Sequence, residues 1–385
     1  MARQNGRDKR IAIVVPRSTD LNRGDQSLVW EAAELLLEMD CCDEVMLLGG
    51  TSDAETQQWH GKLTKDLGFP VLRPFLDNPR RGIHRDRDRV KESRLSLLRI
   101  VFYGISDWLW GRFFLGMCRY PKVARFLVDN DLRKTYEAFR DASMVVVKGG
   151  GFLHSYGGYS ASGYMWYALF YLNLAHRLRK PVIVLPNSFG PFRGLGVLSQ
   201  VRKSLSKCLF VSARETISSA AVAEYLDLSV PVFPDMGYYL DSAPSDVGER
   251  ICSKFGVPLG EKRCVALTVR PYRFPGSANP IELYSRYLRA LSEFVKHISD
   301  KGYHPVFVTQ VSGPSSHEND RLAIQELTSE LTSIDYTWVD ARCDCHILKS
   351  VYGQMDYLVG TRFHSVIFAQ ACGVPCLAVA YGGNK

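Results

Sequence analysis

The chain has 385 residues, of which 46% are hydrophobic and 23% are charged, and its formal net charge is +8. This length exceeds what one ordinary hydrophobic core supports and fits two domains, while the composition is typical of a soluble globular protein. The sequence contains no apolar run as long as a membrane-spanning helix needs and no signal-peptide pattern at its basic N-terminus, so we expect a cytoplasmic protein.

The ten cysteines are scattered along the chain. In a chain of this length without a secretion signal, we expect reduced thiols and not a disulfide framework. Cys343, Cys345 and His346 are residue types that bind zinc, but no second pair at zinc-finger spacing accompanies them. The sequence therefore predicts no metal site.

Short apolar runs alternate with amphipathic stretches along most of the chain. Nearly every run is continuously apolar, as in strands that are buried on both faces of a parallel sheet. The expected strands are 11–15, 44–48, 144–147, 181–185, 209–212, 230–233, 264–269, 305–309, 357–359 and 375–380. The expected helices between them include 26–39, 161–179, 216–226, 280–299 and 320–331. This alternation predicts an α/β fold with right-handed crossovers.

A polar, turn-rich stretch at 241–250 separates two such α/β series. We therefore place a domain boundary near residue 245, which gives an N-terminal domain of 1–245 and a C-terminal domain of 246–385. The segment from about 79 to 135 does not fit the alternation. It is predicted to be a helical insertion in the first domain.

The positive charge is concentrated in one run. Between Arg80 and Arg94 lie seven Lys or Arg and three acids, and the following stretch to Met117 is apolar and aromatic but interrupted by charges. We favour a solvated loop that leads into a helix packed on the protein. The alternative is peripheral contact of Arg80 to Met117 with an anionic membrane surface. No nucleic-acid-binding module accompanies the run, so no nucleic-acid partner is expected.

Ligands of open α/β sheets collect beyond the carboxyl ends of the strands, so the loops there are the candidate sites. Asn22, Gly24 and Asp25 follow the first strand, and Asp25 is expected to cap the next helix. Backbone N–H groups at such a helix start can also bind an anion or a hydroxyl. Gly149, Gly150 and Gly151 follow the 144–147 strand and permit close backbone approach, but they match no nucleotide-binding fingerprint.

Cations follow several of the other strands. Arg214 with Glu215, Arg270, and Arg362 with His364 each stand at the carboxyl end of an expected strand. Each arginine alone is compatible with an ordinary ion pair. Together, in two domains that face one cleft, they predict a site for a compact polyanion, with His364 able to transfer protons near neutral pH.

The ordered motifs resemble those of polysaccharide pyruvyl transferases. The matching segments are Asn22-x-Gly24-Asp25, Gly149 to Gly151, Gly190-Pro191-Phe192, Ala213-Arg214-Glu215, Pro234-Asp235 and Gly360 to Ser365 through Gly373-Val374-Pro375. The resemblance implies a GT-B-like fold, with two Rossmann-like domains whose parallel sheets face a central cleft. It also implies transfer of the pyruvate unit of phosphoenolpyruvate to two hydroxyls of a sugar, which forms a pyruvate ketal.

The resemblance also assigns roles to residues. The family's Arg-x-His falls on Arg362 and His364, its basic residue before a glutamate falls on Arg214, and its C-terminal lysine falls on Lys385, one residue later than the family spacing. Arg214, Arg270 and Arg362 are expected to bind phosphoenolpyruvate, with His364 as the general acid and base. Lys385 is expected to neutralise the departing phosphate. Asn22, Gly24, Asp25, Glu215 and the three glycines complete the expected substrate site, and no cofactor is expected.

Two alternatives stay open from the sequence. One is a GT-B glycosyltransferase that uses a nucleotide sugar, since a fold does not fix the chemistry. The other is a scaffold at the membrane surface in envelope assembly. For the favoured interpretation we expect a glycan or lipid-linked sugar as the acceptor, and a location in the cytoplasm or at the inner face of the membrane.

Overall fold

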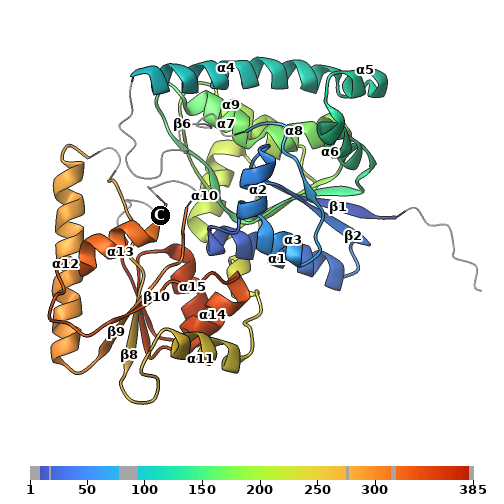
Figure 1. The fold of residues 1–385 in the computed structure, drawn as a ribbon. Helices are drawn as coiled ribbons and strands as arrows, with labels where there is room; N and C mark the ends of the chain where they lie inside the picture. The colour runs from blue at the N-terminus through green and yellow to red at the C-terminus, as the bar shows by residue number, and fades with distance from the viewer. Residues whose placement is uncertain (1–8, 17–18, 78–93, 275–276, 314–317, 381–385) are drawn as a thin grey trace, which may run out of the picture. The chain divides into compact units, whose positions relative to one another are not determined.

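The structure is a computed structural model that describes residues 9–16, 19–77, 94–274, 277–313 and 318–380. These residues form two compact units (Figure 1). Unit 1 contains the described residues of 1–20, 28–85 and 90–236, and unit 2 contains those of 21–27 and 237–385. The sequence predicts an uninterrupted first domain, whereas residues 21–27 group with unit 2 in the structure.

The described part of unit 1 contains a seven-stranded sheet in which every pairing is parallel. The strand order is β3-β2-β1-β4-β6-β5, and β7 also pairs with β6. The strands are β1 (Ile11–Val15), β2 (Glu44–Leu48), β3 (Val71–Leu72), β4 (Met144–Val147), β5 (Gly150–Tyr156), β6 (Val182–Arg193) and β7 (Phe210–Ala213).

The central strands of this sheet are buried on both faces. Ile13 of β1 pairs with Val145 of β4, and both side chains are completely buried. Both faces of a parallel sheet are covered because each crossover places a helix on one of them. The predictions of 11–15, 44–48 and 144–147 as strands are confirmed.

The helices of the sheet crossovers are mostly short. They are α1 (Arg23–Glu38), α2 (Ala54–His60), α3 (Lys62–Asp66), α7 (Ala161–Ala168), α8 (Phe170–Arg177), α9 (Val197–Leu205) and α10 (Thr216–Leu226). Residues 21–27, which include the start of α1, belong to unit 2, and α1 from Leu28 onward belongs to unit 1. The predicted helix 161–179 is interrupted at Leu169, and the predicted helix 216–226 is confirmed.

The described part of the expected insertion is helical. It contains α4 (Arg94–Met117), α5 (Pro121–Phe126) and α6 (Asn130–Asp141), while residues 78–93, including most of the basic run, lie outside the described residues. Phe114 of α4 and Tyr136 of α6 are completely buried and contact each other edge to face. Phe114 also packs 4.8 Å from Phe75 between ring centres. These helices therefore share one core with the sheet of unit 1.

The described part of unit 2 contains a second sheet, also parallel throughout, with five strands in the order β10-β9-β8-β11-β12. The strands are β8 (Cys264–Leu267), β9 (His304–Val308), β10 (Thr337–Val339), β11 (Tyr357–Gly360) and β12 (Cys376–Ala378). The helices are α11 (Ser245–Lys254), α12 (Pro280–Asp300), α13 (Asp320–Thr328), α14 (Cys345–Gly353) and α15 (Phe363–Ala371). The α/β class with two parallel sheets is thus confirmed.

Two segments differ from their prediction. Residues 230–233 form no strand, and only Val232 bridges to Ala213, because the neighbouring Pro231 and Pro234 have no N–H to donate. The strand predicted at 181–185 extends further in the structure, where β6 continues to Arg193. The reason is β5, which pairs alongside this stretch from Gly150 to Tyr156.

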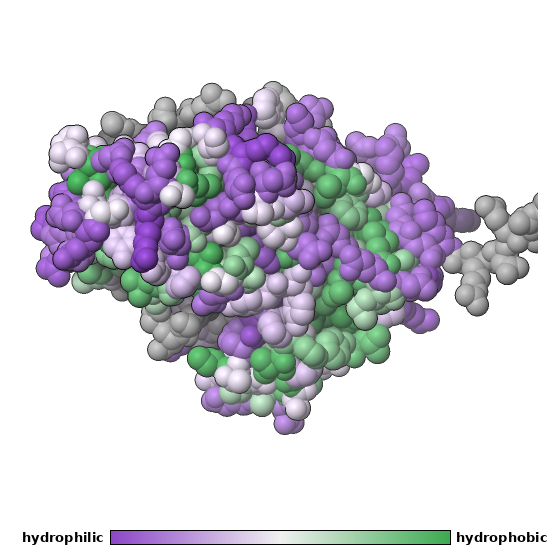
Figure 2. Space-filling view, turned by 90° about the horizontal axis from the view of Figure 1, so that it is seen from below, coloured by the Kyte–Doolittle hydropathy of each residue, from purple (hydrophilic) through white to green (hydrophobic). Residues whose placement is uncertain are grey.

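One face of the protein is mixed in polarity. On the face shown in Figure 2, hydrophilic residues are interspersed with smaller groups of hydrophobic ones, which is ordinary for a surface in contact with water. Among the helices of the described residues, none combines the length and the apolar character required to cross a membrane.

Candidate active site

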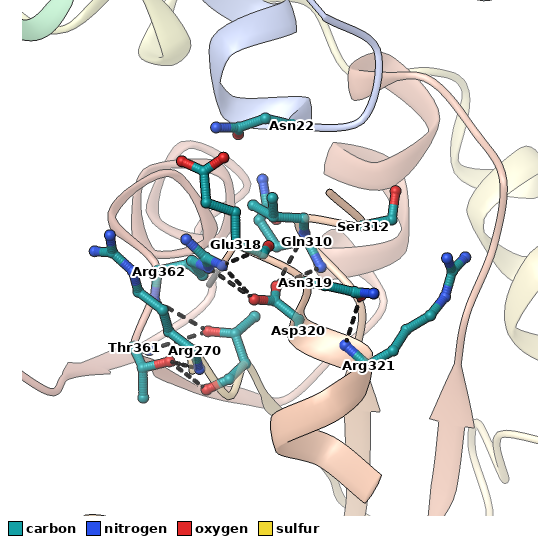
Figure 3. Close-up of polar contacts among 12 residues, drawn as sticks. Asn22, Arg270, Gln310, Ser312, Glu318, Asn319, Asp320, Arg321, Thr361 and Arg362 are labelled. Carbon is teal, nitrogen blue, oxygen red and sulfur yellow. Dashed lines mark hydrogen bonds and ion pairs between the residues drawn. The ribbon is translucent and has the colours of Figure 1, made fainter. Parts of the chain in front are cut away.

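Unit 2 gathers polar side chains where β8, β9 and β11 end (Figure 3). Arg270 follows β8, Gln310 follows β9 and Arg362 follows β11. Since the strands are parallel and neighbours in the order β9-β8-β11, their carboxyl ends lie along one edge of the sheet. This edge is the candidate substrate site of unit 2.

Hydroxyl groups fix the turn between β11 and α15. The N–H of Thr361 donates to Oγ1 of Thr268 at 3.0 Å, and Oγ1 of Thr361 donates to the carbonyl of Thr268 at 2.7 Å. Oγ of Ser365 donates to the carbonyl of Arg362 at 2.7 Å. All four residues are buried. The hydrogen bonds therefore set the backbone that carries Arg362 and His364.

Arg362 forms an ion pair with Asp320. Its Nε and Nη2 lie 2.9 and 2.5 Å from Oδ1 of Asp320, and Nη2 also donates to the carbonyl of Glu318 at 2.9 Å. Oδ2 of Asp320 accepts from the N–H groups of Gln310 and Val311 at 3.2 and 2.9 Å. The sequence predicts that Arg362 binds the anionic substrate. Two of its nitrogens already bind protein groups, which leaves Nη1 without a hydrogen bond to the described residues.

Glu318 is a carboxyl that the sequence analysis does not select. Its burial raises its pKa above the ordinary value, Arg362 and Arg270 lower that pKa, and Asp25 and Asp320 raise it. The carboxyl thus lies within electrostatic reach of two arginines and still holds its proton to a higher pH than usual. An acid just before the start of a helix is a common structural feature, so the sequence around Glu318 does not indicate that its pKa is raised.

His364 lies half-buried in the first turn of α15. Its ring centre is 5.5 Å from that of Phe363, nearly perpendicular to it, and 6.4 Å from that of Phe368. Gly24 is also adjacent, because a Cβ added there would lie 2.4 Å from Nδ1 of His364. Only glycine leaves room for the imidazole at this position, so the structure brings these two predicted site residues together.

Asn22 caps the start of α1. Its Oδ1 accepts from the N–H groups of Gly24 and Asp25 at 3.1 and 3.3 Å, and its Nδ2 donates to Oδ2 of Asp25 at 3.1 Å. The prediction of Asp25 as the cap is wrong, because the helix begins at Arg23 and the side chain of Asn22 occupies the cap position. Asp25 instead lies in the first helical turn.

Arg23 ties this turn to unit 2. Its side chain is buried, its Nε donates to the carbonyl of Cys343 at 3.1 Å, and its Nη1 donates to Oγ of Ser312 at 2.9 Å. The N–H of Ser312 donates to the carbonyl of Leu21 at 2.8 Å. These bonds explain why residues 21–27 group with a part of the chain that is about 290 residues away.

Arg270 completes the cluster in unit 2. Its backbone N–H donates to Oγ1 of Thr361 at 3.0 Å and to Oη of Tyr287 at 3.1 Å. Its guanidinium lies 5.4 Å from the ring centre of Tyr272, in the range of a cation–π contact. Among the described residues of unit 2, the predicted site residues are Asn22, Gly24, Asp25, Arg270, Arg362 and His364.

Arg214 and Glu215 lie in unit 1, directly before α10. Nη1 of Arg214 is 2.8 Å from the buried Asp235, its Nε donates to Oγ of Ser188 at 2.6 Å, and Oε2 of Glu215 is 3.4 Å from the same Nε. Oε1 of Glu215 accepts a short hydrogen bond from Ser218. Arg214 is therefore a cation held in place by Asp235, which the sequence offers only as part of a family motif, and by Ser188, which the sequence does not predict as a site residue.

Gly149 directly precedes β5, and Gly150 and Gly151 are its first two residues. A Cβ on Gly149 would lie 2.9 Å from the carbonyl of Pro186, and one on Gly151 would lie 3.0 Å from Nη2 of Arg214. Gly150 has a φ of 133°, which side chains rarely adopt. The expected close approach is therefore to the protein's own backbone and to Arg214, at the start of a strand that the sequence does not predict.

Lys385 lies outside the described residues. Within the part of the chain that is described, no group of three or more His, Cys, Asp or Glu is arranged to hold a metal ion. Cys343 and Cys345 are buried, and their backbone groups bind Arg23 and Gln26.

Solved structures share the fold. The putative UDP-N-acetylglucosamine 2-epimerase from Listeria monocytogenes is similar at 10% identity and a TM-score of 0.52, over 96% of this chain and 79% of that one. The UDP-GlcNAc 2-epimerase from Neisseria meningitidis, bound to UDP-GlcNAc, has 11% identity and a TM-score of 0.52, over 96% of this chain and 82% of that one. At these identities the likeness shows the GT-B-like fold alone. A comparison with curated proteins found no match.

A family model supplies more than the fold. The model for polysaccharide pyruvyl transferase matches residues 55–383, which is most of the chain. The match includes Arg214, Arg270, Arg362 and His364, begins after the turn at Asn22, and ends before Lys385. The chain therefore belongs to the polysaccharide pyruvyl transferase family.

Proposed function

We propose that the protein transfers the pyruvate unit of phosphoenolpyruvate to two hydroxyls of a sugar, in a cell-surface glycan or its lipid-linked precursor. The product is a pyruvate ketal. The observation that carries the proposal is the cluster of Arg270, Arg362, Glu318 and His364 at one sheet edge, in a member of this family. The cluster offers cations for a small dianion and two groups for proton transfer.

Phosphoenolpyruvate carries a phosphate and a carboxylate, and both need cationic partners. Nη1 of Arg362 and the guanidinium of Arg270 are the candidate partners in unit 2. Both side chains are already oriented, Arg362 by Asp320 and Arg270 by the ring of Tyr272. A cation that is held in place before substrate arrives loses little conformational entropy on binding, which favours a defined position for C2 of the donor.

The proposed reaction balances without a redox partner or a metal. C3 of phosphoenolpyruvate takes up a proton, and the oxygen of the first hydroxyl bonds to C2 and gives up its proton. The bond between C2 and the phosphate oxygen then breaks with its electron pair on phosphate. The second hydroxyl bonds to C2 and loses its proton, which the released phosphate takes up, so one ketal and one inorganic phosphate are formed.

Two groups are proposed to move these protons. His364 is the proposed general acid and base, because imidazole is the side chain most often used for proton transfer in enzymes. Glu318 is the proposed proton donor to C3, because burial raises the pKa of its carboxyl, which therefore keeps its proton to a higher pH than an ordinary carboxyl does. Asn22 and Asp25 are proposed to bind substrate beside them.

The remaining predicted residues keep proposed roles in substrate binding. Arg214, oriented by Asp235 and Ser188, is proposed to bind substrate in unit 1 together with Glu215 and the glycines 149–151. Lys385 is proposed to neutralise the departing phosphate. The competing hypothesis is glycosyl transfer from a nucleotide sugar. Its support is the fold that the chain shares with an epimerase bound to UDP-GlcNAc, and a shared fold does not fix the chemistry.

Ligand binding separates the two hypotheses without knowledge of the acceptor. We expect phosphoenolpyruvate to raise the melting temperature of the full chain, because a ligand at about 100 times its Kd adds about 2.7 kcal/mol of stability. UDP, GDP and CMP at the same concentration should give no shift. Differential scanning fluorimetry measures both.

Arg270→Gln should abolish the shift with phosphoenolpyruvate, whereas Arg273→Gln, at an exposed position three residues later, should keep it. A shift with UDP and none with phosphoenolpyruvate would support the glycosyltransferase hypothesis instead.

Gly24→Ala tests the position of His364. The added Cβ would overlap Nδ1, so the imidazole must move, and a displacement of about 1 Å can cost about 100-fold in rate. The measurement is phosphate release from phosphoenolpyruvate with whichever methyl glycoside acceptor gives the fastest turnover. We expect a kcat about 100-fold lower with an unchanged melting temperature.

Gly163→Ala serves as the control, since a Cβ there meets nothing within 4 Å. In a His364→Ala background, Gly24→Ala should cause no further loss. An additional loss in the double variant would mean that Gly24 acts through another group.

Glu318→Gln should stabilise the protein at alkaline pH. The pKa of Glu318 is raised on folding, so its ionisation costs stability once the pH exceeds the unfolded-state pKa of about 4.3. Below that pH the carboxyl is neutral in both states and the cost disappears. The melting temperature of Glu318→Gln should therefore exceed that of the wild type at pH 8, and the difference should shrink towards pH 4.

Glu293→Gln, at an exposed position of α12, is the control substitution. If the difference in melting temperature between Glu318→Gln and the wild type stayed constant with pH, it would contradict a raised pKa of Glu318. Loss of turnover in the stabilised variant would support its proposed role as a proton donor.

A further inference from the structure

The outward side of α4 is strongly apolar. Its exposed side chains recur at spacings of three and four residues, so they lie on one side of the helix. Each of the following is between 54% and 68% exposed: Leu98, Val101, Phe102, Ile105, Leu109 and Phe113. A surface helix of a water-soluble domain normally has polar side chains there, so this face needs a partner.

The opposite side of α4 is fixed to unit 1. Phe114 is completely buried and stacks on Trp110 with 5.3 Å between ring centres. Gly111 lies so close to the unit that a Cβ there would be 2.6 Å from the ring of Trp166. The helix is therefore apolar on both sides, and tight packing on one side presents the other to the exterior.

Apolar side chains are also exposed on α5, which follows α4 along the same edge of unit 1 in Figure 1. Tyr120 at its start, Val123 and Phe126 are exposed, and Phe126 is 89% exposed. Together these side chains of α4 and α5 form what we call the apolar ridge. It extends over more than one helix and so exceeds the scattered hydrophobic residues of an ordinary surface.

Exposed cations lie in the same segment as the apolar ridge. Arg99, Arg112, Arg119 and Lys122 are exposed, and the single acid between residues 94 and 128, Asp107, is half-buried. The guanidinium of Arg112 lies 5.0 Å from the ring centre of Trp108, a partly exposed residue that suits the boundary between water and lipid. The charge at the ridge is therefore complementary to an anionic surface.

We propose that the apolar ridge binds the surface of an anionic lipid bilayer, with α4 and α5 lying in the plane of the headgroups. A helix that packs on the protein with one side and presents apolar residues between cations with the other has the features of an interfacial helix. Pairing of two copies through this face would bring the arginines of both copies together, so the charges disfavour self-association. The inference does not depend on the donor substrate.

Vesicle flotation tests the proposal with the full chain. The wild type should float with vesicles of phosphatidylcholine and phosphatidylglycerol, and bind vesicles of phosphatidylcholine alone much more weakly. Phe102→Ser should lower the partition coefficient by about tenfold or more, because one buried aromatic side chain is lost from the lipid contact. Arg99→Gln and Arg112→Gln should each lower it by about fivefold on the anionic vesicles only.

Ile281→Ser on α12 is the matched control, since Ile281 is 82% exposed but lies in unit 2, away from the ridge in sequence. It should bind vesicles like the wild type, and all variants should keep the melting temperature of the wild type. Ile105→Ser provides a second ridge variant. Failure of the wild type to float, or undiminished binding of both ridge variants, would overturn the proposal. A dimer in solution that Phe102→Ser dissociates, without vesicle binding, would identify a second copy as the occupant.

Discussion

The buried ion pair between Arg362 and Asp320 is the interaction on which the site in unit 2 depends. Removing two charges from water costs several kcal/mol per ion, and here the cost is offset by direct contacts and by two backbone N–H groups that donate to the aspartate. Loss of one partner would leave the other charge buried, at about 3–5 kcal/mol. Because Asp320 begins α13 beyond β9 and Arg362 follows β11, the pair joins strand ends on both sides of β8.

This constraint gives the site its chemical character. Two nitrogens of Arg362 are held by hydrogen bonds to the protein. Glu318 lies beside it, and burial raises the pKa of its carboxyl. His364 is held beside the glycine of a turn that Arg23 anchors to the same unit. The fold itself is shared with sugar epimerases, so the family match and these particular side chains carry the proposed pyruvyl transfer, not the architecture.

The sequence predicts well what depends on local pattern and poorly what depends on distant partners. Continuous apolar runs identify β1, β2 and β4 with their correct bounds. The strand β5 is not predicted, because it begins with glycines, which are typical of turns. Arg362 is predicted as a site residue from its turn, but its ion pair with Asp320, 42 positions away, has no local signal in the sequence. The grouping of residues 21–27 with unit 2 likewise arises from contacts across the length of the chain.

The central claim is the formation of a ketal from phosphoenolpyruvate, and the structure of the product tests it most directly. The full chain is incubated with phosphoenolpyruvate labelled with carbon-13 at C2 and a set of methyl glycosides, and the products are examined by NMR. The account predicts a labelled quaternary carbon bonded to two oxygens of one sugar, with inorganic phosphate released in equal amount. A phosphorylated sugar, or a sugar that carries the label as an enol ether, would contradict it.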